Sequence, residues 1–291
     1  MDGRHLDRGR QAPAYGGVTE SHTPAANVIE AERLGYVEYE IDIERVLRTD
    51  LPGVLDRVPI APLTPEAVNA IPAGAKGAYV LFENGHPVYA GKTDTRHGFR
   101  DRLGRHAFTI QHRQNLDPST IGFKAIRILV FSNFDVEAIL IDALRKADKS
   151  ALRWNDSGFG SNDPGHNRER QEPAGFDVER PIDIDRPLGL PSATYALLDL
   201  LIMLKDGLPF TLRYQTDQLP GKKRPKHYRT GHADQRTASP VAVGEADTLR
   251  SILTKALAVL PAGWRVTVFP DRVILYAETE PYPYAREYIP A

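Results

Sequence analysis

The sequence predicts an α+β protein, with a small core of three antiparallel strands flanked by helices and a smaller α+β domain after it. Two short apolar runs separated by Asn84-Gly85 give the first indication, because this dipeptide is a strong signal for a β-hairpin. Helical periodicity on both sides of an apolar run at 123–131 gives the second. A change of composition near Pro191, in a chain of 291 residues, indicates the additional domain.

The composition restricts the class of protein. Hydrophobic residues make up 41% of the chain and charged residues 26%, as in soluble globular proteins. No apolar run approaches the roughly 18–20 residues that span a bilayer, and no secretory signal is visible, so no membrane association is expected. The absence of cysteine excludes disulfides and fits a cytoplasmic location. Because the net charge is −1, nucleic-acid binding would need a local concentration of positive charge.

The N-terminal elements lead up to the hairpin. Residues 1–27 mix glycine, proline and polar residues without apolar periodicity, and we expect them to be disordered. A first domain is predicted over 28–190, beginning with a short strand and a helix within 28–55. The two strands of the hairpin are predicted at 77–82 and 87–91.

Helix and strand then alternate. A helix predicted over 98–111 places Phe99 and Leu103 on its apolar face, and the run at 123–131 predicts a third, central strand. A second helix is expected over 135–146.

Ser132 or Asn133 can cap that second helix, since both side chains accept hydrogen bonds from the first turn. Residues 155–190 are rich in glycine, proline and asparagine and predict a long loop.

The C-terminal domain is expected over 191–291. A helix at 193–204, a strand at 210–214, a helix at 245–260 and two strands around Asp271-Arg272 make it a small α+β unit. Its role is not indicated by any motif.

Two tyrosines lie on the predicted hairpin, and its turn decides how they face. A two-residue loop at Asn84-Gly85 pairs Tyr79 with Ala90 and turns the tyrosines to opposite faces. A three-residue loop places Tyr79 across from Tyr89. A shared chemical site requires the second register; otherwise the two rings are ordinary strand aromatics.

Arg102 and His106 are four residues apart and therefore share one face of the predicted helix. A solvated basic helix is the plain alternative. Asp94 and Asp101 are the only acidic residues among a cluster of cations that suits a phosphate backbone. The cluster consists of Lys92, Arg96, Arg100, Arg102, Arg105 and Arg113.

Two further residues carry possible chemistry. Glu137 lies in the first turn of its helix, where a carboxylate is favourable for dipole reasons alone. It could equally hold Mg²⁺, which takes only one or two protein ligands and keeps several waters. Asn155 follows Trp154 and is either a turn residue or part of a site.

The residues above occur in one order: tyrosine, tyrosine, lysine, Arg-x-x-x-His, glutamate, asparagine. This order resembles the GIY-YIG nuclease superfamily, whose two name motifs correspond to Gly77-Ala78-Tyr79 and Tyr89-Ala90-Gly91. The runs Trp154-Asn155, Gly158-Phe-Gly160 and Asp163-Pro-Gly165 are similar to the type II restriction endonuclease branch. The resemblance covers roughly residues 75–185 and implies a small GIY-YIG-like core.

The resemblance also implies a role for each residue in phosphodiester hydrolysis. Tyr79 would be the general base, its pKa lowered by Lys92 and a metal-bound environment. Arg102 would contact the scissile phosphate, and Glu137 would hold one Mg²⁺, for which Mn²⁺ can substitute. His106 would orient the base or share proton transfer. Tyr89 and Asn155 would support placement of the phosphate and of the tyrosine.

The expected function is that of a metal-dependent endonuclease acting on double-stranded DNA as a restriction enzyme. A homodimer fits a palindromic site, and a cognate DNA methyltransferase would be a partner. A non-specific or structure-specific nuclease of repair, mobile elements or toxins is the first alternative, and a catalytically silent DNA-binding module is the second. The basic helix suggests DNA contacts through Arg96, Arg100 and Arg105.

A second basic run lies in the C-terminal domain. It comprises Lys222, Lys223, Arg224 and Lys226, which could contact the DNA backbone, while Tyr228 could stack on a base. A solvated loop on a dimerisation domain explains the same residues.

Overall fold

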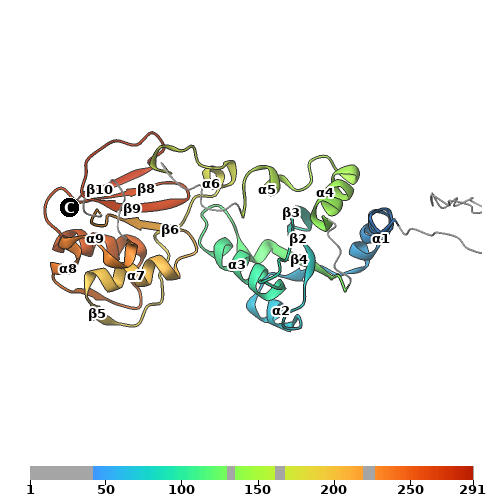
Figure 1. Ribbon diagram of the computed structural model, residues 1–291, viewed down its shortest axis with the longest axis horizontal. Helices are drawn as coiled ribbons and strands as arrows, with labels where there is room; N and C mark the ends of the chain where they lie inside the picture. Colours follow the sequence, from blue (N-terminus) through green and yellow to red (C-terminus); the bar gives the residue numbers. More distant parts are fainter. Residues whose placement is uncertain (1–41, 130–134, 161–167, 219–226, 291) are drawn as a thin grey trace, which may run out of the picture. The chain divides into compact units, whose positions relative to one another are not determined.

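The computed structural model describes residues 42–129, 135–160, 168–218 and 227–290. The chain divides into two compact units, Met1–Val46 and Leu47–Ala291. Helix α1, Ile43–Arg57, begins in the first unit, and every later element belongs to the second. The fold is α+β, with helices and with sheets that are antiparallel apart from one parallel pair, β6 and β9 (Figure 1). The expectations for residues 1–27 and for the strand before α1 lie outside the described residues.

The first sheet has four strands in the order β1-β4-β2-β3, all antiparallel. The hairpin strands are β2, Gly77–Glu83, and β3, His86–Lys92, and β4 is Ile121–Arg127. The prediction of three strands is therefore one short. The additional strand, β1, is only Ala61–Pro62, and its proline lacks the N–H of a regular ladder, which hides such a strand from pattern analysis.

The hairpin turn is the two-residue type, so the predicted requirement for a three-residue loop is wrong. Glu83 pairs with His86, and Asn84 and Gly85 have φ of 51° and 82°. Positive φ at both central residues is typical of a type I′ turn, which Asn-Gly favours. By itself this turn would send the two tyrosines to opposite faces.

A β-bulge restores the common face. Phe82 pairs with Pro87 but Leu81 pairs with Tyr89, so Val88 is an extra residue in β3. Beyond the bulge Tyr79 pairs with Gly91, which puts the two tyrosines on the same side of the sheet as diagonal neighbours. The register therefore differs from both predicted pairings, Tyr79 with Ala90 and Tyr79 with Tyr89. The two rings nevertheless lie on the same face of the sheet, as the three-residue loop would have placed them.

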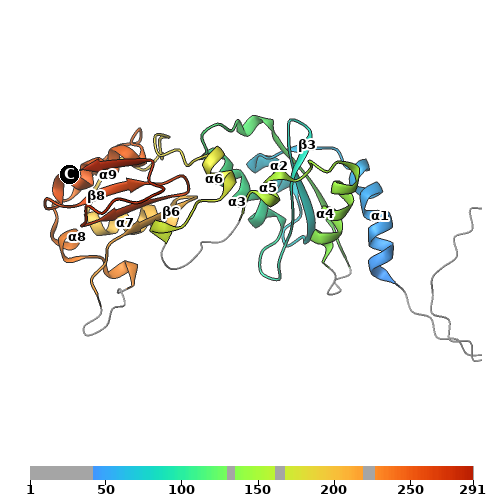
Figure 2. The same ribbon diagram turned by 90° about the horizontal axis from the view of Figure 1, so that it is seen from above.

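The two faces of this sheet are covered by different helices. Val80 packs with Leu51 and Leu55 of α1 and with Leu140 of helix α4, Val136–Ala147. Tyr79 and its same-face neighbours pack instead against helix α3, Phe99–Gln111, and helix α2, Pro65–Ala70. Figure 2 shows α3 and α4 on opposite sides of the strands. The alternation along β2 thus places Tyr79 and Leu81 in one hydrophobic core and Val80 and Phe82 in the other.

The helices expected over 98–111 and 135–146 are confirmed as α3 and α4. The cap of α4 is Asp135, whose side chain accepts from the backbone N–H of Ala138, and not Ser132 or Asn133, which lie outside the described residues. The described part of the predicted loop 155–190 contains the end of α5, Arg153–Asp156, the 3-10 helix η2, Arg168–Arg170, and α6, Gly175–Glu179. A one-turn helix is too short for periodicity to reveal.

A second sheet follows in the order β10-β8-β9-β6. Its strands are β6, Thr211–Tyr214, β8, Arg265–Val268, β9, Arg272–Tyr276, and β10, Glu287–Pro290. Helix α7, Leu197–Gly207, packs on β6, and helix α9, Leu249–Val259, packs on β8.

The helix predicted over 193–204 starts too early, because Ala193–Tyr195 form strand β5. This strand pairs with β7, Val241–Val243, a strand separated from it by more than forty residues and invisible to local pattern. Helix α8, Ala233–Thr237, completes this part of the fold.

The hydrophobic cores follow this arrangement. Phe176 belongs to the aromatic core of the first sheet, whereas Ile182 and Ile184 belong to the core of the second. The chain passes from one core to the other between these residues. Across the described segments, no helix is both long and apolar enough to cross a membrane.

Candidate active site

Tyr79 and His106 form the centre of the candidate site. The Tyr79 hydroxyl lies 2.8 Å from Nε2 of His106, joining β2 to α3. Both residues are buried, Tyr79 at 1% exposure and His106 at 7%. Burial raises the pKa of the Tyr79 phenol well above its usual value, so the hydroxyl is protonated at neutral pH and has a proton to donate.

His106 is held neutral by its surroundings. Burial, together with the smaller effects of the positive charges of Arg102 and Arg105, lowers its pKa to about 4. The ring of Phe159 stacks on the imidazole, with centroids 5.0 Å apart and planes at 29°. A neutral imidazole has one free lone pair, and the tautomer with its proton on Nδ1 presents that lone pair to the Tyr79 hydroxyl.

Tyr89 completes an aromatic cluster around this pair. Its ring centroid lies 6.2 Å from that of Tyr79 and 5.3 Å from that of His106. Gly91 makes the approach possible, because a Cβ there would lie 2.7 Å from the Tyr79 hydroxyl and 2.9 Å from a ring carbon of Tyr89. Gly160, at φ +72°, lies beside the Tyr89 hydroxyl. The glycine of the Tyr89-Ala90-Gly91 motif is thus needed for the two tyrosine rings to meet.

Lys92 does not lower the pKa of Tyr79, contrary to the prediction. Its ammonium is 2.8 Å from Asp135, the cap of α4, and both side chains are exposed. The cation that favours the ionised phenol is Arg102, and burial outweighs it, so the pKa moves upward. A lysine three residues past a tyrosine on a strand points to the other face, which explains the difference.

Arg102 lies beside the tyrosines and is fixed by Asp94. A guanidinium nitrogen of Arg102 is 2.7 Å from the Asp94 carboxylate. Asp94 also accepts from the ring of His97 and from the backbone N–H groups of His97 and Arg96, which hold its pKa well below the usual range. The buried Nε of Arg102 has no hydrogen-bond partner among the described residues.

Glu137 contributes a half-buried carboxylate to the same place. Burial raises its pKa, and its charge acts on Tyr79 and Tyr89 and is itself stabilised by Lys92 and Arg102. Its carboxylate makes no hydrogen bond or ion pair within the described part of the chain. No set of three or more candidate metal-binding side chains occurs in those same segments. A single open carboxylate fits a hydrated Mg²⁺ with one protein ligand.

Asn155 acts on the hairpin backbone. Its side-chain carbonyl accepts from the N–H of Ala90 and its amide donates to the carbonyl of Ala90, both at 2.9 Å. This pairing occupies the outer edge of β3, next to Tyr89 on one side and Gly91 on the other. Asn155 therefore positions the tyrosine.

Fewer residues of the predicted basic cluster are available to contact DNA than the sequence indicates. Arg113 is 2.6 Å from Asp177 and is largely buried, so it belongs to the packing of α3 against α6 and not to a DNA-facing surface. Arg96, Arg100 and Arg105 are exposed and make no ion pair with any described residue. The predicted contacts at Lys222, Lys223, Arg224 and Lys226 lie outside the described residues.

Tyr228 is described and is already engaged. Its hydroxyl donates to Asp206, and the guanidinium of Arg229 lies 5.3 Å from its ring centroid. Stacking on a base would have to displace these contacts.

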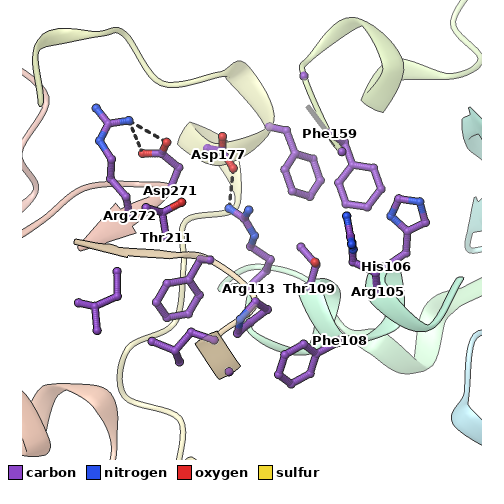
Figure 3. Close-up of a pocket in the computed structure, with 18 of the residues that line it drawn as sticks. Arg105, His106, Phe108, Thr109, Arg113, Phe159, Asp177, Thr211, Asp271 and Arg272 are labelled. Atoms are coloured by element: carbon purple, nitrogen blue, oxygen red, sulfur yellow. Dashed lines mark hydrogen bonds and ion pairs between the residues drawn. The ribbon is translucent and has the colours of Figure 1, made fainter. Parts of the chain in front are cut away.

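A pocket of about 850 Å³ lies at the candidate site. Tyr89, Arg102 and His106 line one part of it, and Arg105 and Thr109 continue along α3 (Figure 3). The ion pairs Arg113–Asp177 and Asp271–Arg272 stand at another part of its wall.

Three contributors were not recognised as site residues from the sequence. Phe159 covers His106, Asp94 holds Arg102, and Asp135 neutralises Lys92. Phe159 lies within the Gly158-Phe-Gly160 run, so the motif marked it without indicating its role. The two aspartates carried no signal beyond their charge.

No protein-family model matches this chain, and no curated protein is significantly similar to it.

Proposed function

We propose that the protein is a metal-dependent DNA endonuclease of the GIY-YIG type that hydrolyses phosphodiester bonds in double-stranded DNA, as a restriction enzyme. The observation that carries the proposal is the hydrogen bond between Tyr79 and a neutral His106. A buried phenol is a poor base alone, but a neutral imidazole at hydrogen-bond distance can receive its proton. The same tyrosine experiences the charges of Arg102 and Glu137.

The proposed reaction uses these groups together. The Tyr79 oxygen takes a proton from the attacking water while the Tyr79 hydroxyl proton passes to Nε2 of His106. The water oxygen forms a bond to phosphorus, and the bond from phosphorus to the 3′-oxygen breaks. Arg102, held by Asp94, binds the phosphate through its remaining N–H groups.

Glu137 is the residue that would hold Mg²⁺, since its carboxylate is open and lies beside the tyrosines. When bound, the ion supplies positive charge that stabilises the phosphate and the leaving 3′-oxygen. Tyr89 borders the phosphate position, and Asn155 keeps Tyr89 in place through Ala90.

Cleavage of plasmid DNA in Mg²⁺ by the Glu137→Ala variant tests the proposal. We expect the wild type to cut and the variant to lose cleavage while still binding DNA in Ca²⁺. Asp142→Ala, on the same helix and in an exposed ion pair with Arg48, is the matched control and should cut normally. Mg²⁺-dependent cutting that persists in Glu137→Ala would sink the mechanism.

The same digestion separates the alternatives. Discrete bands from wild-type enzyme mean sequence-specific cutting, as expected of a restriction homodimer with a companion methyltransferase. A smear means a non-specific nuclease with the same chemistry. Specific binding without cutting in any divalent metal would indicate a silent DNA-binding module.

A further inference from the structure

A stripe of polar side chains continues from the candidate site along α3. Arg102, Arg105 and Thr109 are spaced by three and four residues and so lie on one side of the helix. All three line the pocket that also contains Tyr89 and His106 (Figure 3). The stripe therefore begins at the reacting groups and leads away from them.

The two outer members of the stripe have open donors. Arg105 is exposed and makes no ion pair or side-chain hydrogen bond with any described residue. Thr109 is half-buried, and its hydroxyl likewise makes no hydrogen bond with any described residue. The neighbouring guanidiniums are committed, Arg102 to Asp94 and Arg113 to Asp177. Along α3, Arg105 is thus the guanidinium beside the site that is free to take an anion.

The spacing suits consecutive phosphates. An α-helix rises 1.5 Å per residue, so Arg105 lies about 4.5 Å along the axis from Arg102. Each DNA strand carries one phosphate per about 3.4 Å of duplex axis. The flexible arginine stem covers the difference between these two values.

We propose that Arg105 and Thr109 form a binding subsite for the phosphate next to the scissile one in the same strand. This inference rests on the proposed nuclease function and adds the path of the substrate strand, which runs along α3 from Arg102 toward Thr109. The ligand is a backbone phosphodiester, bound without regard to base identity.

The subsite also affects the chemistry of the dyad. The charge of Arg105 lowers the pKa of His106, after the larger effect of burial. A phosphate bound to Arg105 offsets that charge. His106 consequently gains proton affinity when the substrate strand is in place, at the stage when it must receive the Tyr79 proton.

Methylphosphonate interference tests the subsite on the full-length protein. Duplexes carry the mapped cut site with one neutral methylphosphonate at the scissile phosphate or at a single neighbour, and binding is measured in Ca²⁺. Wild-type protein should lose about tenfold in affinity at the scissile position and at one adjacent position, the typical effect of a charge-assisted contact. The Arg105→Gln variant should lose sensitivity at the adjacent position and keep it at the scissile one.

Two further variants complete the test. Thr109→Val should reduce the adjacent-position effect in part, and it supplies the answer if Arg105→Gln does not fold. Arg57→Gln removes an exposed arginine from α1, which packs on the opposite face of the sheet, and should retain both effects.

The outcomes distinguish failure of the phosphate subsite from failure of the proposed nuclease function. Wild-type protein that neither cuts nor binds DNA overturns the proposed function and the subsite with it. Protein that cuts normally while Arg105→Gln and Thr109→Val keep full sensitivity at the adjacent phosphate overturns the subsite alone.

Discussion

The Tyr79 hydroxyl and His106 Nε2 lie 2.8 Å apart, across 27 residues of sequence, inside a cluster of aromatic rings. The phenol is protonated and the imidazole is neutral, so the phenol is the donor of this bond in the tautomer of His106 that carries its proton on Nδ1. In that tautomer, a proton that leaves the phenol has Nε2 of His106 adjacent to receive it.

Removing the phenol oxygen should stop cleavage without unfolding the protein. Tyr79→Phe keeps the ring that packs against Phe99 and removes only the hydroxyl. We expect the cleavage rate to fall by about 10²–10⁴, the usual contribution of general base catalysis. Single-turnover cleavage and thermal unfolding measure the two effects. Tyr195→Phe, which loses a hydroxyl bonded to Pro191 far from the site in sequence, should cleave at the wild-type rate.

Stability should depend on pH through His106. Its folded pKa of about 4 lies below the usual value of 6.5, so the unfolded chain binds the extra proton first as the pH falls. The free energy of unfolding should therefore fall as pH drops from about 6.5 to about 4, by up to about 3 kcal/mol. Urea unfolding at several pH values measures this loss. His106→Gln should flatten that part of the profile; an unchanged slope in the variant would assign the effect to other groups.

Gly91→Ala should disrupt the site through sterics. The new Cβ would lie 2.7–2.9 Å from atoms of both tyrosines, and the rings are confined by the surrounding core. We expect a loss of about 1–3 kcal/mol in stability and a large loss of cleavage. Gly104→Ala is the stability control, since nothing lies within 4 Å of its added Cβ, and in a helix it should stabilise by up to about 1 kcal/mol. Equal stabilities for the two variants would contradict this account.

Asn155 should affect catalysis through position. Asn155→Ala removes two hydrogen bonds to Ala90, which we expect to destabilise the protein by about 2 kcal/mol and to lower the single-turnover rate while DNA affinity in Ca²⁺ stays near wild type. Asn155→Asp keeps the acceptor for the Ala90 N–H and loses the donor to the Ala90 carbonyl. Its single-turnover rate should therefore lie between those of the wild type and of Asn155→Ala. A drop in DNA affinity matching the drop in rate would point to direct phosphate contact instead.

Phe159 should set the acid limb of the activity profile. Its stacked ring contributes to the burial that lowers the pKa of His106, and cleavage requires neutral His106. Phe159→Leu opens the imidazole to water, so the pH at which activity is half lost should move up toward 6.5. Cleavage rates from pH 4 to 8 measure the limb. If the pH of half-maximal activity is unchanged in the variant, whatever its maximal rate, the Phe159 stack does not control the pKa of His106.

Much of the fold could be predicted from local pattern. The Asn84-Gly85 turn, the hairpin strands, α3 and α4 each depend on residues close in sequence, where turn chemistry and periodicity apply. Strands β5 and β7 could not be predicted in this way, because each is only three residues long and is defined by its pairing with the other. The two-residue β1 is hidden for the same reason.

The chemical groups that the candidate site could contain were readable from residue order alone: two tyrosines, an arginine, a histidine and a carboxylate. Their protonation states and neighbours depend on the folded protein. The bulge at Val88 placed Tyr89 on the side of Tyr79, and burial set the charge of both Tyr79 and His106. Lys92 forms an ion pair with Asp135 and does not act on the phenol. Phe159, from a later segment of the chain, stacks on the imidazole. Register and burial depend on every neighbour a residue acquires in space, and those neighbours are distant in the chain.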